Sequence, residues 1–310
     1  MTRFWRRLWF GPLAALLVVY AAFALLAPAT FAGDINLETM ARQTVVVAIT
    51  SLGMTFVILL GGIDLSVGSA VALTSVVVAR ALRSGAPPLE AAALGLLTPA
   101  LAGLGSAALI TRLKITPFIA TLGAMTVLRG IAKGLAGEQK IDADPRGLDG
   151  LMNSGPGASL PAGVFLALGL ALAGAVVLHK TVFGRHVVAI GSNAEAARLC
   201  GVPVPRVTLL VYALAGALTG VAGVLEFSTL TVGDPTDSLG LELKVIAAVV
   251  IGGGSLSGGQ GSIAGSLLGA LLMTVIQTGC THVGVPNWVQ EIVTGVIIVV
   301  AISIDRLRRR

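Results

Sequence analysis

The sequence predicts an all-α membrane protein, a polytopic bundle of about ten transmembrane helices forming one domain over residues 1–310. Of its 310 residues 55% are hydrophobic and only 12% are charged, and the mean hydropathy is +0.93, which excludes an ordinary soluble chain. Apolar runs such as 13–26 and 293–302 do not alternate with polar residues, as a membrane β-barrel requires. Helices of about 20 residues with short connectors fit this length about ten times.

The first expected span, 11–27, follows a basic start in which Trp5 and Trp9 are placed as interfacial anchors. No convincing small-residue cleavage site follows it, so we interpret it as an uncleaved span rather than a signal peptide. The 241–254 range is short and ends in glycines, so we expect a partial or broken helix there. Hydropathy and turn residues place the other spans at 43–60, 65–82, 90–110, 116–134, 161–180, 207–227, 262–279 and 287–303.

Charge predicts the orientation. Basic residues cluster at both termini and in the loop 179–206, and the positive-inside rule therefore places both termini and this loop in the cytoplasm. The segments 135–160 and 231–239 then lie outside. The net charge of +6 is explained by this orientation, and we expect contact with membrane lipid but no nucleic-acid partner.

The loop from about 179 to 206 contains a short helix-forming run, Asn193–Cys200, with Asn193 placed as the N-cap and Gly201 as the stop. A helix of about eight residues is unstable alone in water, so it persists only when it packs on its own protein or on a partner. Glu195 and Arg198 can pair at i, i+3 or bind that partner. The competing interpretation is a simple cytoplasmic connector.

Two segments are candidates for a substrate pathway. The run Gly61–Ser69 places Asp64 between two apolar spans, where it could bind a coupling proton, contact substrate or cap the following helix. In the fifth span, Phe118, Thr121 and Met125 share one helical stripe, and a threonine hydroxyl there could bond a sugar or another helix.

The sequence contains no set of residues that indicates catalysis. Leu256–Gln260 reads LSGGQ, the signature of ABC ATPases, but the chain has no phosphate-binding loop and no room for a nucleotide-binding domain, so we interpret the match as coincidence. The pattern Gly-Gly-x-x-Leu-Ser-x-Gly fits both 61–68 and 252–259, which suggests two similar tight connections at one face. The three histidines are scattered, and Cys200 and Cys280 are expected on opposite sides of the membrane, so neither a metal site nor a disulfide is expected.

Four segments, GGIDLSVGSAVALTSVV, TPFIATLGAMTVLRG, FGRHVVAIGSNAEAARLCGV and VIAAVVIGGGSLSGGQGSIAGSLLGALLM, occur in this order along the chain. In this the chain resembles permease subunits of bacterial ABC importers for monosaccharides of the ribose, galactose and xylose type. The 256–260 turn departs from the Lys- or Arg-bearing glycine turn more usual in such permeases. Related permeases for branched-chain amino acids and nucleosides share the architecture, and an ion-coupled secondary transporter is the other alternative.

The resemblance implies a multi-pass subunit of the bacterial inner membrane that binds no cofactor and has no ATPase site of its own. It implies three kinds of partner: an ATP-binding cassette subunit that uses ATP and Mg, a periplasmic or lipid-anchored sugar-binding protein, and a second permease copy in a homodimer or heterodimer. It also implies that the 179–206 loop couples to the ATPase, through residues Gly191, Asn193, Glu195, Ala196, Arg198 and Leu199.

Overall fold

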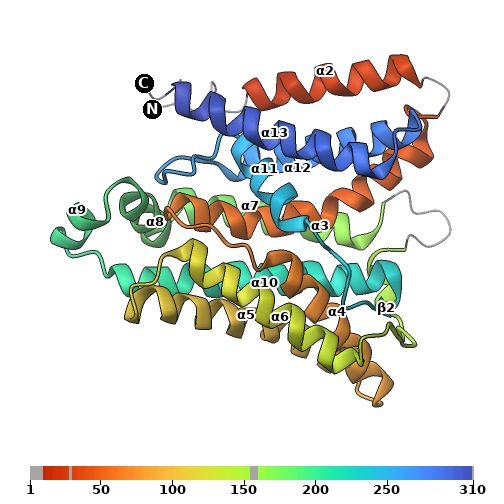
Figure 1. Cartoon of the computed structure of the whole chain (residues 1–310), viewed down its shortest axis with the longest axis horizontal. Coiled ribbons are helices and arrows are strands. Elements are labelled where there is room, and N and C mark those ends of the chain that lie inside the picture. The colour runs from red at the N-terminus through yellow and green to blue at the C-terminus, as the bar shows by residue number, and fades with distance from the viewer. Residues whose placement is uncertain (1–9, 28–29, 154–159, 309–310) are drawn as a thin grey trace.

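The computed structural model describes residues 10–27, 30–153 and 160–308, and within them the protein is a bundle of helices (Figure 1). The elements in chain order are α2 (Phe10–Leu26), α3 (Asp34–Leu59), α4 (Val67–Arg83), α5 (Pro88–Arg112), α6 (Pro117–Ala136), β1 (Ile141–Asp142), η1 (Leu148–Leu151), α7 (Ala162–Lys180), α8 (Val182–Ser192), α9 (Ala194–Leu199), α10 (Val204–Leu230), β2 (Val232–Gly233), α11 (Leu241–Ile251), α12 (Ile263–His282) and α13 (Asn287–Arg308).

Each of the ten ranges predicted to span the membrane falls on a helix, but the helices differ in length. Among the described residues, six are long and apolar enough to cross a membrane by length and composition, namely α3, α5, α6, α7, α10 and α12. By contrast, α11 has 11 residues and rises only about 16 Å, too little for a hydrocarbon layer of about 30 Å. The expectation of a partial helix at 241–254 is confirmed.

The core forms where glycines allow helix backbones to touch. In α10, Gly216 and Gly220 face the backbone of α5, and Gly223 faces Thr74 of α4. A side chain at Gly265 of α12 would collide with the carbonyl of Gly252, so α11 and α12 pack equally closely. The four-residue glycine spacing therefore serves close helix packing, which lipid alone cannot drive by hydrophobic burial.

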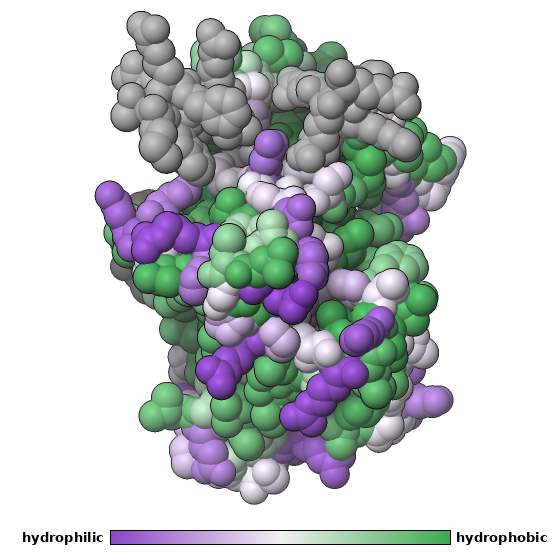
Figure 2. Space-filling view, turned by 90° about the vertical axis from the view of Figure 1, so that its left-hand side faces the viewer, coloured by the Kyte–Doolittle hydropathy of each residue, from purple (hydrophilic) through white to green (hydrophobic). Residues whose placement is uncertain are grey.

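The two ends of the bundle differ in character. The pair α8 and α9 projects from one end, toward which α2 begins and α13 finishes (Figure 1). Figure 2 views the molecule from this end and shows hydrophilic residues gathered among apolar ones. At the opposite end, β1 pairs antiparallel with β2, and Lys140 forms a 3.0 Å ion pair with Asp234. That end is also braced by Arg80, which donates to the carbonyl of Leu135 at 2.8 Å.

One non-helical segment lies inside the bundle, between α3 and α4. After α3 ends at Leu59, residues 62–66 have no helical structure, and α4 begins only at Val67. A side chain at Gly68 in the first turn of α4 would collide with Glu242 and with the carbonyl of Ser238, so α4 starts beside the start of α11. Non-helical backbone of this kind is tolerated at membrane depth only when protein or a water-filled cavity covers it.

Candidate coupling helix and membrane pathway

The polar loop between α7 and α10 folds into two helices rather than the single one that its sequence predicts. The additional helix, α8, is amphipathic: it buries Gly184, Val187 and Ile190 while Arg185 stays exposed. Its N-cap is Thr181, whose hydroxyl oxygen accepts from the backbone N–H of Gly184 at 3.2 Å. The buried residues recur at 184, 187 and 190, and this helical spacing is the sequence signal that could have revealed the helix.

The short helix α9 occurs where the sequence predicts it. The Asn193 side chain accepts from the backbone N–H of Ala196 at 2.9 Å, which is the expected N-cap bond. The chain leaves the helix through Gly201 at φ +83°, a left-handed conformation that favours glycine. Glu195 and Arg198 form the predicted i, i+3 ion pair, with a 3.1 Å bond from Nε.

One side of α9 is anchored and the other is open. Ala197 is buried against the body of the protein. Ala196 and the Glu195–Arg198 pair are exposed, and Leu199 is 76% exposed. The helix therefore presents a small mixed apolar and charged surface. Gly191, just before it, is wedged against the carbonyl of Leu59 at the end of α3.

Asp64 lies in the non-helical segment between α3 and α4, where it is only 6% exposed. Its Oδ1 accepts from the backbone N–H and from the hydroxyl of Ser66, at 2.8 Å and 2.6 Å. These bonds form a turn over residues 64–66, just before α4, whose N-cap is Ser66 and has no side-chain cap bond, so Asp64 does not cap the first turn of α4 directly. They do not test its contact with a proton or a substrate.

The α6 stripe is divided between core and surface. Thr121 is fully buried and donates to the carbonyl of Ile63 at 3.0 Å, so it holds the non-helical segment against α6. Met125 is half-buried, whereas Phe118 is 50% exposed. The three residues therefore do not form one continuous surface along a substrate pathway, because the central residue, Thr121, bonds the protein's own backbone.

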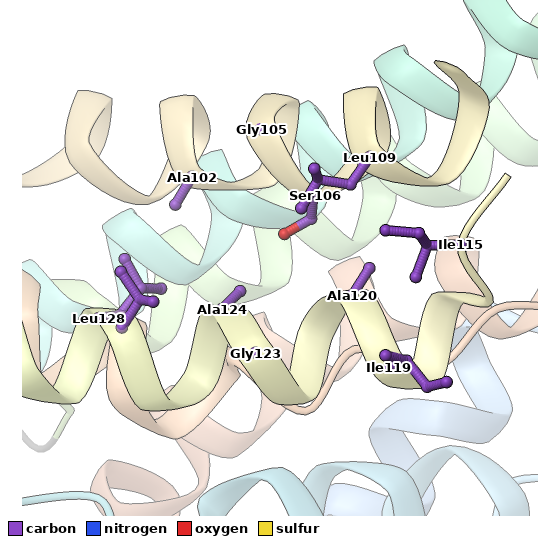
Figure 3. A pocket seen from close by; sticks show the side chains of 11 residues that line it. Ala102, Gly105, Ser106, Leu109, Ile115, Ile119, Ala120, Gly123, Ala124 and Leu128 are labelled. Atoms are coloured by element: carbon purple, nitrogen blue, oxygen red, sulfur yellow. The ribbon is translucent and has the colours of Figure 1, made fainter. Parts of the chain in front are cut away.

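The neighbouring face of α6 forms a shallow apolar groove with α5, of about 410 Å³ (Figure 3). In Figure 3 the small residues Ala120, Gly123 and Ala124 of α6 lie opposite Ala102 and Gly105 of α5. Ser106 provides the hydroxyl group in its lining. Such a surface suits an acyl chain or another helix better than a hydrated ligand.

Sequence reasoning missed a polar cluster near the β-strand end of the bundle. Glu226 of α10 hydrogen-bonds the side chain of Asp237. Lys244 of α11 donates to Gln277 of α12 at 3.0 Å. It also interacts electrostatically with Glu291, Glu226 and Asp237. The signal was a carboxylate within a predicted span, because ionisable residues in membrane helices are costly and usually functional.

Arg129 of α6 joins this region to the loop before α11. It donates to the carbonyls of Pro235 and Asp237, each at 2.8 Å. Cys200 is exposed and Cys280 buried, and both are free thiols. Within the described residues, no group of three or more His, Cys, Asp or Glu side chains is arranged to hold a metal ion.

Comparison with known proteins agrees with this architecture. A family model described as "Branched-chain amino acid transport system / permease component" matches residues 36–302. The chain is 40% identical over 304 residues to the ribose import permease protein RbsC of Bacillus subtilis (strain 168), covering 96% of this chain and 92% of the relative. It is 37% identical over 300 residues to RbsC of Escherichia coli (strain K12), covering 96% and 93%.

A third relative, the L-arabinose ABC transporter permease protein AraH of Azospirillum brasilense, is 36% identical over 304 residues, covering 96% of this chain and 88% of the relative. No solved structure matches the chain.

Proposed function

The chain belongs to the permease-component family that this model describes, and on that premise we propose that it is the membrane-spanning subunit of an ATP-driven importer for a monosaccharide. The observation that carries the proposal is its identity of 36–40%, along nearly its whole length, to permeases named for ribose and for arabinose. The description of the family model mentions branched-chain amino acids, but these relatives favour a sugar as the transported substrate.

The proposed complex supplies what this chain lacks. Its sequence has no phosphate-binding loop, so a separate ATP-binding cassette subunit hydrolyses ATP with Mg, and this chain carries out no chemistry. A periplasmic or lipid-anchored binding protein delivers the sugar, and a second permease copy completes the pathway. The assembly lies in the bacterial inner membrane, with both termini and α9 on the cytoplasmic side.

Two properties of α9 support a docking role. It is capped and ion-paired internally, so its shape is pre-formed, and its outer face exposes Leu199 beside the Glu195–Arg198 pair. A helix this short gains stability mainly from what it packs against, and Ala197 supplies only a small buried contact on the side of the bundle. Insertion of α9 into a cleft of the ATPase covers the exposed leucine.

The test is reconstitution in liposomes. The chain with its neighbouring ATPase and binding protein should import radiolabelled ribose or arabinose only when ATP is present on the α9 side. The isolated chain should neither hydrolyse ATP nor transport sugar. Uptake by the isolated chain, driven by a proton or sodium gradient, would instead support the ion-coupled alternative suggested by Asp64. Competition with leucine distinguishes the amino-acid alternative from the sugar one.

A further inference from the structure

The LSGGQ turn contacts the end of α8 and the end of α3 at the same point. The N–H of Gly259 donates to the carbonyl of Leu59 at 2.9 Å. A Cβ built on Gly258 would lie 2.6 Å from the carbonyl oxygen of Gly191, and one on Gly259 would lie 2.5 Å from Oγ of Ser192. Three segments far apart in sequence thus meet mainly through backbone atoms, together with the Ser192 hydroxyl.

Each segment at this junction continues into a different element of the structure. Ser192 is followed at once by Asn193, the cap of α9. Leu59 is followed by the non-helical segment that carries Asp64. The turn itself connects α11 to α12, whose backbones meet where Gly252 packs on Gly265. The junction therefore joins the start of α9, the Asp64 segment and the α11–α12 connection at one contact.

The turn is built to be stiff. It closes on itself through bonds from Ser255 N–H to the Gln260 carbonyl and from Gly258 N–H to the Ser255 carbonyl, each 2.9 Å. Gly258 and Gly259 have φ of +85° and +73°, conformations that side chains disfavour. Because close-packed backbone has no rotamers that could absorb movement, it transmits a displacement rather than dissipating it.

We infer that the Gly258–Gly259 turn is a positioning element that moves as one body with α9 and transmits its movement to the Asp64 segment and to the α11–α12 pair. This inference rests on the proposed function, since it concerns how an ATPase docked on α9 reaches the membrane pathway. It also gives the glycines of this LSGGQ sequence a structural purpose that has nothing to do with nucleotide.

The first experiment substitutes Gly259→Ala in the reconstituted complex. The added methyl group pushes Ser192 away, so sugar imported per ATP hydrolysed should fall about tenfold or more, a size typical of coupling between sites, while hydrolysis continues. The matched control is Gly284→Ala: Gly284 has φ of +79°, but a Cβ there meets nothing within 4 Å. A wild-type import ratio in Gly259→Ala overturns the inference, as does an equal loss in the control.

The second experiment leaves Gly258 and Gly259 unchanged. Spin labels are attached to Cys200 at the end of α9 and to a Ser257→Cys variant in the turn, both exposed, with Cys280→Ser as background. The distance between the labels should be the same with and without ATP, whereas the distance from Cys200 to a label at Thr98 on α5 should change. A change between α9 and the turn overturns the inference. If the wild-type complex imports no sugar, it is the proposed function that fails.

Discussion

The hydroxyl of Thr121 donates a 3.0 Å hydrogen bond to the backbone carbonyl of Ile63, in the middle of the non-helical segment that separates α3 from α4. Thr121 is fully buried and also bonds the carbonyl of Pro117 within its own helix. One side chain therefore connects the first turns of α6 to a segment that has no helical structure.

Thr121→Val should destabilise the protein by about 1–3 kcal/mol, because it preserves shape but leaves the Ile63 carbonyl buried without this donor. The loss is measured as a lower midpoint of thermal unfolding in detergent and as reduced ATP-driven uptake. Thr121→Ser keeps the donor and serves as the control. Equal uptake in the valine variant and the wild type would show that the bond does not position the segment.

Asp64→Asn should retain ATP-driven uptake, because an asparagine oxygen still accepts from the N–H and hydroxyl of Ser66. Asp64→Ala should lose both stability and uptake. Transport by the two variants in proteoliposomes checks this prediction. Loss of uptake in Asp64→Asn with normal unfolding behaviour would instead assign the carboxylate a role in transport that depends on its charge.

Asn193→Ala should weaken α9 by about 1 kcal/mol, since the N-cap bond to the N–H of Ala196 is lost. We expect less ATPase bound to the membrane subunit and less sugar imported per ATP. Asn193→Asp preserves the cap and is the matched variant. Pull-down of the ATPase with each variant measures the effect.

The Glu195–Arg198 pair should contribute to docking through its charges, so Glu195→Arg with Arg198→Glu should preserve the internal pair yet reduce ATPase binding. The hydrogen bond from Arg198 lowers the pKa of the Glu195 carboxyl below its ordinary value of 4.5. A lowered carboxyl pKa stabilises the fold above the unfolded value, and this contribution is lost as pH falls through the folded value. ATPase binding measured from about pH 6 to 8 should therefore show no transition from this pair.

Glu226→Gln should transport nearly as well as the wild type, because an amide keeps the hydrogen bond to Asp237 without needing a shared proton. Glu226→Ala removes this partner of Asp237 and a nearby charge from Lys244, and uptake should fall. Uptake at saturating binding protein separates the two variants. If the two variants take up sugar equally well, the hydrogen bond between Glu226 and Asp237 is not needed for transport.

Local sequence determined several features of this protein because their causes lie within a few residues. Hydrophobic runs located the ten helical ranges. Asn193 and Gly201 set the bounds of α9, since a cap bond reaches three residues ahead and a left-handed turn needs only its own residue. The pairing of Glu195 with Arg198 follows from helical spacing alone.

The tertiary structure decided what depends on residues far apart in the chain. Sequence alone could not show that the Thr121 hydroxyl donates to the carbonyl of Ile63, 58 residues away. Nor could it show that Glu226 hydrogen-bonds Asp237 across a turn. It also suggested two similar glycine turns at one face, but not that Gly259 bonds the carbonyl of Leu59 against the end of α8. Contacts without side chains leave no periodic pattern in a sequence, so only the packing of whole helices reveals them.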